Sequence, residues 1–205
     1  NEMKTDDLIT LMTQDAPVGL RYGRGLALAL AAGIVFSVAL LVVTIGLRHN
    51  MASVFETVRV LFKIIVTLVL AILATRLAVR IGRPGEETGR PARLLALPAL
   101  MIAAAVIAEL IALPADAWRP NLVGRNALFC LFFVPVLLWG LRRGVPQNPM
   151  AAGAAAGLAA GAIAAAIYAW HCPDDSPLFL ATWYVIAIAI TTAFAALLGQ
   201  RWLRW

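Results

Sequence analysis

The sequence contains little charge for its length. Only 14% of the 205 residues are charged, whereas 62% are hydrophobic, and the mean hydropathy is +0.86. A soluble domain of this composition would expose a hydrocarbon surface to water. The scarcity of charge therefore argues against a water-soluble domain and favours a chain whose solvent is a lipid bilayer.

Histidine and cysteine are also scarce, with two residues of each. His49 and His171 lie too far apart for a HExxH metalloprotease motif, and GxSxG, Walker A and strand-linked GxGxxG motifs are missing. Cys130 and Cys172 form no CxxC pair, which argues against a quinone-linked thiol oxidoreductase. The sequence therefore predicts a protein that is not an enzyme and has no resident cofactor.

Long apolar runs fill most of the chain. A helix needs about 20 apolar residues to cross roughly 30 Å of hydrocarbon, and six stretches separated by prolines and glycines satisfy this. The predicted spans are Gly25–Leu47, Val58–Val79, Leu94–Leu113, Leu122–Leu141, Met150–Trp170 and Leu178–Leu198. The predicted fold class is an all-α membrane protein, a six-helix transmembrane bundle with a short N-terminal helix in a cytoplasmic tail.

Three regions follow from these spans: a tail (1–24), a transmembrane domain (25–199) and a C-terminal end (200–205). Met3 is predicted to be the natural start, so Asn1 and Glu2 are expected to be additional residues. The first apolar run is too long for a signal peptide and lacks a cleavage site. We therefore expect it to remain in the mature protein.

The basic residues fall unevenly between the two sides of the predicted bundle. Twelve of the 17 are on one side: Lys4, Arg21, Arg24, Arg76, Arg80, Arg83, Arg90, Arg93, Arg142, Arg143, Arg201 and Arg204. Five are on the other: Arg48, Arg59, Lys63, Arg119 and Arg125. Because Lys and Arg in short loops resist translocation, this predicts an inner-membrane protein with both termini in the cytoplasm. The net charge of +6 then needs no nucleic-acid partner.

Two charged residues interrupt the apolar runs. Lys63 and Glu109 each lie about five residues, or roughly 7 Å, from the periplasmic end of a predicted span. Charges at such positions are either functional or near enough to an end to reach water. If the second and third spans are neighbours, the two residues share a depth. We predict a structural ion pair rather than a proton relay, because no further ionisable residue lies deeper.

Glycine recurs every fourth residue in the fifth span, at Gly153, Gly157 and Gly161. The spacing places one smooth stripe on the helix, where a neighbouring backbone can approach closely. Packing within the chain is the favoured interpretation over a dimer interface.

The tail has the pattern of a short amphipathic helix. Thr5 can cap it, Asp6 and Asp7 suit the positive end of the helix dipole, and Pro17 ends the segment. Its apolar face consists of Leu8, Ile9, Leu11 and Met12. Interfacial membrane helices usually carry a basic polar face, whereas this one is acidic. We therefore favour a protein groove over the membrane surface as its binding site.

Polar residues also collect in the last periplasmic loop, which reads Trp170-His-Cys-Pro-Asp-Asp-Ser-Pro177. It sets the Cys172 thiol beside His171, Asp174 and Asp175, a combination that can meet a metal or an oxidant. Cys130 is expected near the same surface. A disulfide is chemically permitted in the periplasm but requires Cα atoms within about 7 Å. A buried inert thiol and a paired sensor both remain open for Cys130.

The tail Thr5-Asp-Asp-Leu-Ile9 with Asp15 and Pro17, the six spans and the loop His171-Cys-Pro-Asp-Asp-Ser-Pro177 together resemble the NrsF-type membrane anti-sigma factors of proteobacteria. The resemblance covers essentially the whole chain. It implies that the tail holds an extracytoplasmic-function sigma factor at the membrane and that Cys130 and Cys172 sense heavy-metal or oxidative stress. Thr5, Asp6, Asp7, Leu8, Ile9, Leu11, Met12, Asp15 and Pro17 are then the expected sigma-binding residues.

The tail is shorter than a zinc-type anti-sigma domain and lacks its His and Cys ligands, so any metal sensing is expected elsewhere, as transient binding at the cysteines. The alternative function is a small six-helix transporter or channel for a metal ion, with Lys63, Glu109 and His171 along its path. Deleting Met3 to Val18 separates the two, since it would release a sigma factor but scarcely alter transport.

Overall fold

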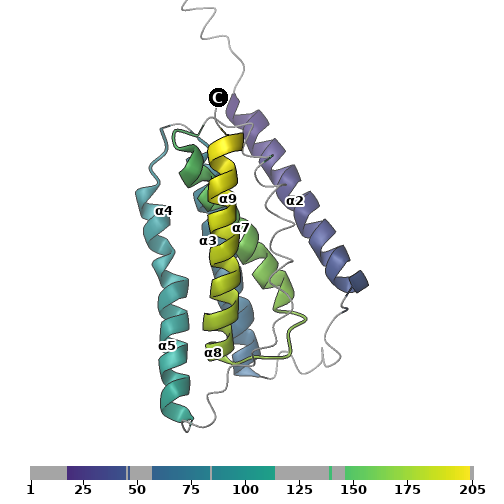
Figure 1. Cartoon of the computed structure of the whole chain (residues 1–205), viewed down its shortest axis with the longest axis vertical. Coiled ribbons are helices and arrows are strands. Elements are labelled where there is room, and N and C mark those ends of the chain that lie inside the picture. The colour runs from purple at the N-terminus through teal and green to yellow at the C-terminus, as the bar shows by residue number, and fades with distance from the viewer. Residues whose placement is uncertain are drawn as a thin grey trace, which may run out of the picture.

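A computed structural model of the chain describes residues 18–44, 46, 57–83, 85–113, 139 and 146–203, and these residues are helical or in short connections (Figure 1). The helices are α2 (Val18–Thr44), α3 (Val58–Ile81), α4 (Gly89–Leu94), α5 (Ala96–Ala112), α7 (Pro149–Tyr168), α8 (Pro177–Phe179) and α9 (Val185–Trp202). A five-residue π-helix, η3 (Leu180–Tyr184), joins α8 to α9.

Five segments of this described part are long and apolar enough to cross a bilayer: Gly23–Val43, Val58–Ile81, Gly89–Ala112, Pro149–Tyr168 and Pro177–Trp202. They correspond to five of the six predicted spans and are compatible with a membrane protein. The predicted fourth span, Leu122–Leu141, lies outside the described residues except for Trp139, which is helical. The count of six spans therefore stays a prediction.

The helix ends follow local chemistry. Asn148 accepts a hydrogen bond from Ala151 N at 3.0 Å and precedes Pro149, so α7 begins with a side-chain cap and a proline at its first position.

The break between α4 and α5 follows from a proline. Pro98 lacks an N–H, and its ring crowds the carbonyl four residues earlier. Accordingly α4 ends at Leu94, and α5 begins at Ala96. The third span thus starts at Gly89 rather than at Leu94.

The centre of the described bundle is α7, which packs against α3 on one side and α9 on the other. Its glycine stripe faces α9: a Cβ added at Gly157 would lie 2.6 Å from Ala195 Cβ and 2.7 Å from Thr191 O. A Cβ at Gly161 would lie 3.2 Å from Ile188 Cα. The stripe therefore serves close packing between two helices of one chain.

The two ends of the bundle differ in polarity. In Figure 1 the start of α2 and the end of α9 lie at the same end of the molecule, together with the connection between α3 and α4. We call it the basic end, and its described cations are Arg24, Arg76, Arg80, Arg83, Arg90, Arg93 and Arg201. The opposite end, called the loop end, carries the start of α3, the end of α5 and the connection from α7 to α8.

Candidate functional site

The connection from α7 to α8 folds tightly over the loop end. Asp174 Oδ1 accepts a hydrogen bond from Ser176 N at 3.0 Å, which closes an Asx turn. Ser176 is the N-cap of α8, and its hydroxyl accepts from Phe179 N at 3.5 Å. We call residues 171–178 the thiol loop, because Cys172 lies within it. Hydrogen bonds within the loop involve Asp174 and Ser176, and other polar contacts of the loop are made with α3 and α5.

Lys63 of α3 supplies the strongest contact with the thiol loop. Its Nζ donates to Asp175 Oδ1 at 2.6 Å, to the Cys172 carbonyl at 2.8 Å and to the Asp174 carbonyl at 2.9 Å. An ammonium has three N–H donors, so every donor of Lys63 has a partner. The residue is 2% exposed, and a buried cation requires this complete set of partners because it has lost its hydration.

Glu109 of α5 holds the other half of the thiol loop. Its Oε2 accepts from the Ser176 hydroxyl and from Leu178 N, both at 2.9 Å. Its Oε1 lies 3.5 Å from Arg59 Nη1 of α3. The carboxylate thus sits at the N-terminus of α8, where a negative charge is favourable.

The predicted ion pair between Lys63 and Glu109 is not the arrangement that forms. The two residues lie at the same end of the bundle, as their spacing predicts, but Lys63 pairs with Asp175 and Glu109 with Arg59. The reason is that the thiol loop contacts both residues: Asp175 of the loop pairs with Lys63, while Glu109 accepts hydrogen bonds from Ser176 and Leu178 and has Arg59 of α3 as its cation.

Cys172 is 2% exposed, and its Sγ lies 3.7 Å from the Asp174 carbonyl. It belongs to a buried cluster with Val66, Phe179, Leu180 and Tyr184. Cys172 is a free thiol in the described structure. Cys130 lies outside the described residues, so the distance between the two cysteines stays a prediction.

His171 connects the thiol loop to the end of α2. Its Nδ1 lies 2.8 Å from the Gly46 carbonyl, and since a carbonyl only accepts, Nδ1 carries the proton in this contact. Gly46 has φ of 80°, a conformation that glycine adopts without strain, and its N–H donates to the Leu41 carbonyl at 2.9 Å. The His171 ring also packs on Tyr168 at 5.8 Å between centroids.

The residues proposed for sensing do not converge on one point. His171 turns towards Gly46, and Asp175 binds Lys63. Within the described residues, no three His, Cys, Asp or Glu side chains lie close enough together to hold a metal ion. The ammonium of Lys63 instead binds the carbonyls of Cys172 and Asp174 and one carboxylate oxygen of Asp175.

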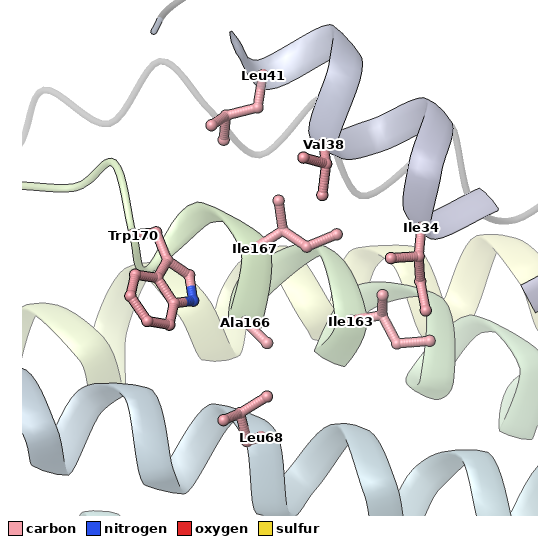
Figure 2. Close-up of a pocket in the computed structure, with 8 residues that line it drawn as sticks. All are labelled: Ile34, Val38, Leu41, Leu68, Ile163, Ala166, Ile167 and Trp170. Carbon is pink, nitrogen blue, oxygen red and sulfur yellow. The ribbon is translucent and has the colours of Figure 1, made fainter. Parts of the chain in front are cut away.

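An apolar pocket of about 370 Å³ lies between α2 and the helices α3 and α7. Figure 2 shows Ile34, Val38 and Leu41 of α2 opposite Ile163 and Ile167 of α7. Leu68 of α3 and Trp170 complete its lining with Ala166. Trp170 directly precedes the thiol loop, so the pocket extends from the loop end along α2.

The sequence did not identify Arg59 and Ser176 as site residues. Arg59 was counted only for topology, and Ser176 only as part of the loop. An N-cap serine followed by proline was the available signal for Ser176. The predicted tail residues, from Thr5 to Pro17, lie outside the described residues.

The fold and site describe a class of protein: a helical bundle compatible with membrane insertion, whose polar contacts gather around one thiol-bearing loop. Residues 11–205 match the NrsF family, described as "Negative regulator of sigma F", and the chain belongs to this family. This description is that of a regulatory family.

Two relatives show the extent of the similarity. The "Anti-sigma-F factor NrsF" of Caulobacter vibrioides is 30% identical over 215 aligned positions, covering 99% of this chain and all of that protein. The "Probable anti-sigma-F factor NrsF" of Azospira oryzae is 32% identical over 93 residues, which are 44% of this chain and 42% of that protein. No solved structure matches the chain significantly.

Proposed function

We propose that the protein is an inner-membrane anti-sigma factor. Its cytoplasmic N-terminal segment sequesters an extracytoplasmic-function sigma factor, and heavy-metal or oxidative stress acting on periplasmic thiols releases it. The observation that carries this proposal is the His171–Gly46 contact, which joins the thiol loop to the helix that continues into the tail. Family membership supplies the sigma factor as the class of partner.

The distribution of charge supports the orientation. Arg80 lies in the last turn of α3 and Arg201 in the last turn of α9, both at the basic end. At the loop end, Lys63 pairs with Asp175 and Arg59 pairs with Glu109. Because Lys and Arg in short loops favour the cytoplasmic side, the larger number of basic residues at the basic end supports a periplasmic thiol loop.

The tail has the chemistry of a peptide that binds a basic protein groove. Asp6, Asp7 and Asp15 supply negative charge, and Leu8 and Leu11 supply apolar anchors one turn apart. A sigma factor has basic surfaces because it contacts DNA, so an acidic helix can compete for them. The tail needs no metal of its own for this binding.

Signal transfer is proposed to pass through α2. The thiol loop contacts Gly46, two residues beyond the end of α2, and residues 18–24 of the tail form the first turns of that helix. A change at Cys172, or at Cys130 if it lies nearby, alters the loop, and α2 carries that change across the membrane. Transient metal binding or oxidation at the thiols is the proposed trigger.

The first test is co-purification of the cell's sigma factors with the full-length protein. We expect one sigma factor to bind the native protein and to be lost from the Leu8→Asp/Leu11→Asp variant, since two charges would enter the apolar face. The matched control, Thr10→Asp/Thr13→Asp, adds the same charge to the polar face and should retain binding. If both variants still bind the sigma factor, or if no sigma factor co-purifies with the native protein, the proposal is rejected.

The transporter alternative gains no support from the described residues. Lys63 and Glu109 bind the thiol loop, and His171 binds Gly46. The three residues predicted to line a transport path therefore make structural contacts between the thiol loop and other parts of the chain. Deletion of Met3 to Val18 still separates the two functions.

A further inference from the structure

We propose that Lys63 and Glu109 are positioning residues that keep the Cys172 thiol closed to water-soluble reagents. In this arrangement the thiol reacts only from a minor state in which one half of the thiol loop has left its helix. The inference deepens the proposed function, because it assigns the control of thiol access to two residues outside the loop.

The Lys63 contact acts on the backbone that carries the thiol. Two of its three acceptors are the carbonyls of Cys172 and Asp174, on either side of Pro173. Backbone acceptors cannot rotate away as side chains do, so the ammonium determines where the Cα of Cys172 lies. The sulfur is then directed into the buried cluster of Phe179, Leu180 and Tyr184.

The Glu109 contact closes the other half of the same loop. One carboxylate oxygen accepts from both the Ser176 hydroxyl and Leu178 N at 2.9 Å. Residues 172–175 are therefore held by α3 and residues 176–178 by α5. The loop can expose Cys172 only after one of these two helices gives up its hydrogen bonds.

Both contacts are made by a charged side chain that is buried. Lys63 is neutralised by Asp175, whose side chain is 14% exposed, and Glu109 by Arg59. Without Lys63 the thiol loop loses three hydrogen bonds to α3, and without Glu109 it loses two hydrogen bonds to α5. Removal of Lys63 or Glu109 therefore favours the open loop rather than a repacked closed one.

The thiol chemistry controlled in this way needs no redox partner. In reaction with a maleimide, the Cys172 thiol loses its proton to water and the thiolate sulfur bonds to one carbon of the reagent's double bond. The other carbon then takes up a proton. Soft metal cations and other electrophiles reach the same sulfur by the same opening.

The test measures the rate at which a maleimide linked to polyethylene glycol modifies Cys172 in full-length protein in lipid nanodiscs. The Cys130→Ser background leaves one thiol. We expect Lys63→Met and Glu109→Gln to raise this rate at least about tenfold, because modification follows the population of the open loop. Asp175→Asn should give a smaller rise, since Lys63 keeps its two carbonyl acceptors.

Glu86→Gln is the matched control, because Glu86 pairs with Arg80 and Arg83 at the basic end and should leave the rate unchanged. If Lys63→Met fails to fold, Glu109→Gln and Asp175→Asn decide the question. Rates within about twofold of the parent in these folded variants would overturn the inference. Sigma-factor binding does not enter this assay, so failure of the thiol gate and failure of the proposed function are separate results.

Discussion

Lys63 shows what one buried cation requires. It lies among apolar residues of α3, yet three oxygen acceptors surround its ammonium and one of them is charged. The sequence identified Lys63 and Glu109 as important because charges are rare within apolar runs. It could not identify their partners. Depth along a helix follows from residue spacing, whereas the path of the thiol loop between α3 and α5 depends on tertiary packing.

The Lys63–Asp175 pair predicts strong coupling in a double-mutant cycle. Lys63→Met and Asp175→Asn should each destabilise the protein, Lys63→Met more, since it removes all three hydrogen bonds between the ammonium and the thiol loop. The double variant should lose less than the sum of the two, with a coupling energy of about 1 to 3 kcal/mol. Unfolding in mixed detergent micelles, followed by circular dichroism, measures all four proteins. Additive losses would mean that the 2.6 Å contact contributes little.

At the scale of helices, the sequence predicted all five of the described spans, with ends shifted by a few residues. Helix α2 begins at Val18, seven residues before the expected Gly25, so part of the tail 1–24 is helical. Apolar length is independent of tertiary contacts, which is why spans can be predicted from it. The π-helix at Leu180–Tyr184 was not predicted, because no local residue pattern distinguishes it from α-helix.

The approach of α7 to α9 predicts opposite effects of the same substitution at two glycines. Gly157→Ala should lower the melting temperature, because its Cβ would lie within 2.8 Å of three atoms of α9. Gly23→Ala meets nothing within 4 Å and should stabilise by up to about 1 kcal/mol, since alanine favours helix. Thermal unfolding in detergent compares the two. Equal shifts would show that α7 and α9 are further apart than described.

The contact between His171 of the thiol loop and Gly46 predicts that one substitution can prevent release of the sigma factor without changing its binding. His171→Phe keeps an aromatic ring but removes the donor to the Gly46 carbonyl, whereas Asn at the same position can keep it. The Phe variant should bind the sigma factor normally yet induce a sigma-dependent reporter several-fold less under stress, and the Asn variant should respond as the native protein does. A fully inducible Phe variant would exclude this route of coupling.

At the scale of the whole molecule, the proposed orientation predicts that cysteines introduced at the loop end and at the basic end react with thiol reagents from opposite sides of the membrane. In a cysteine-free background, Pro173→Cys should react in intact cells with a thiol reagent that cannot cross the inner membrane. Gln147→Cys, beside the start of α7, should react only after the cells are permeabilised, because it belongs to the cytoplasmic basic end. Both positions are exposed, so burial does not bias the comparison. The reverse pattern would invert the proposed orientation.

Helix α2 has a mechanical property that follows from its length and its attachment. It contains 27 residues and is therefore about 40 Å long, with the Gly46 contact at one end and the tail at the other. If it pivots about the loop end, a tilt of about 10° displaces the start of the helix by roughly 7 Å. A shift of a few tenths of an ångström close to such a pivot is thus magnified several-fold at the cytoplasmic surface, as at the long arm of a lever.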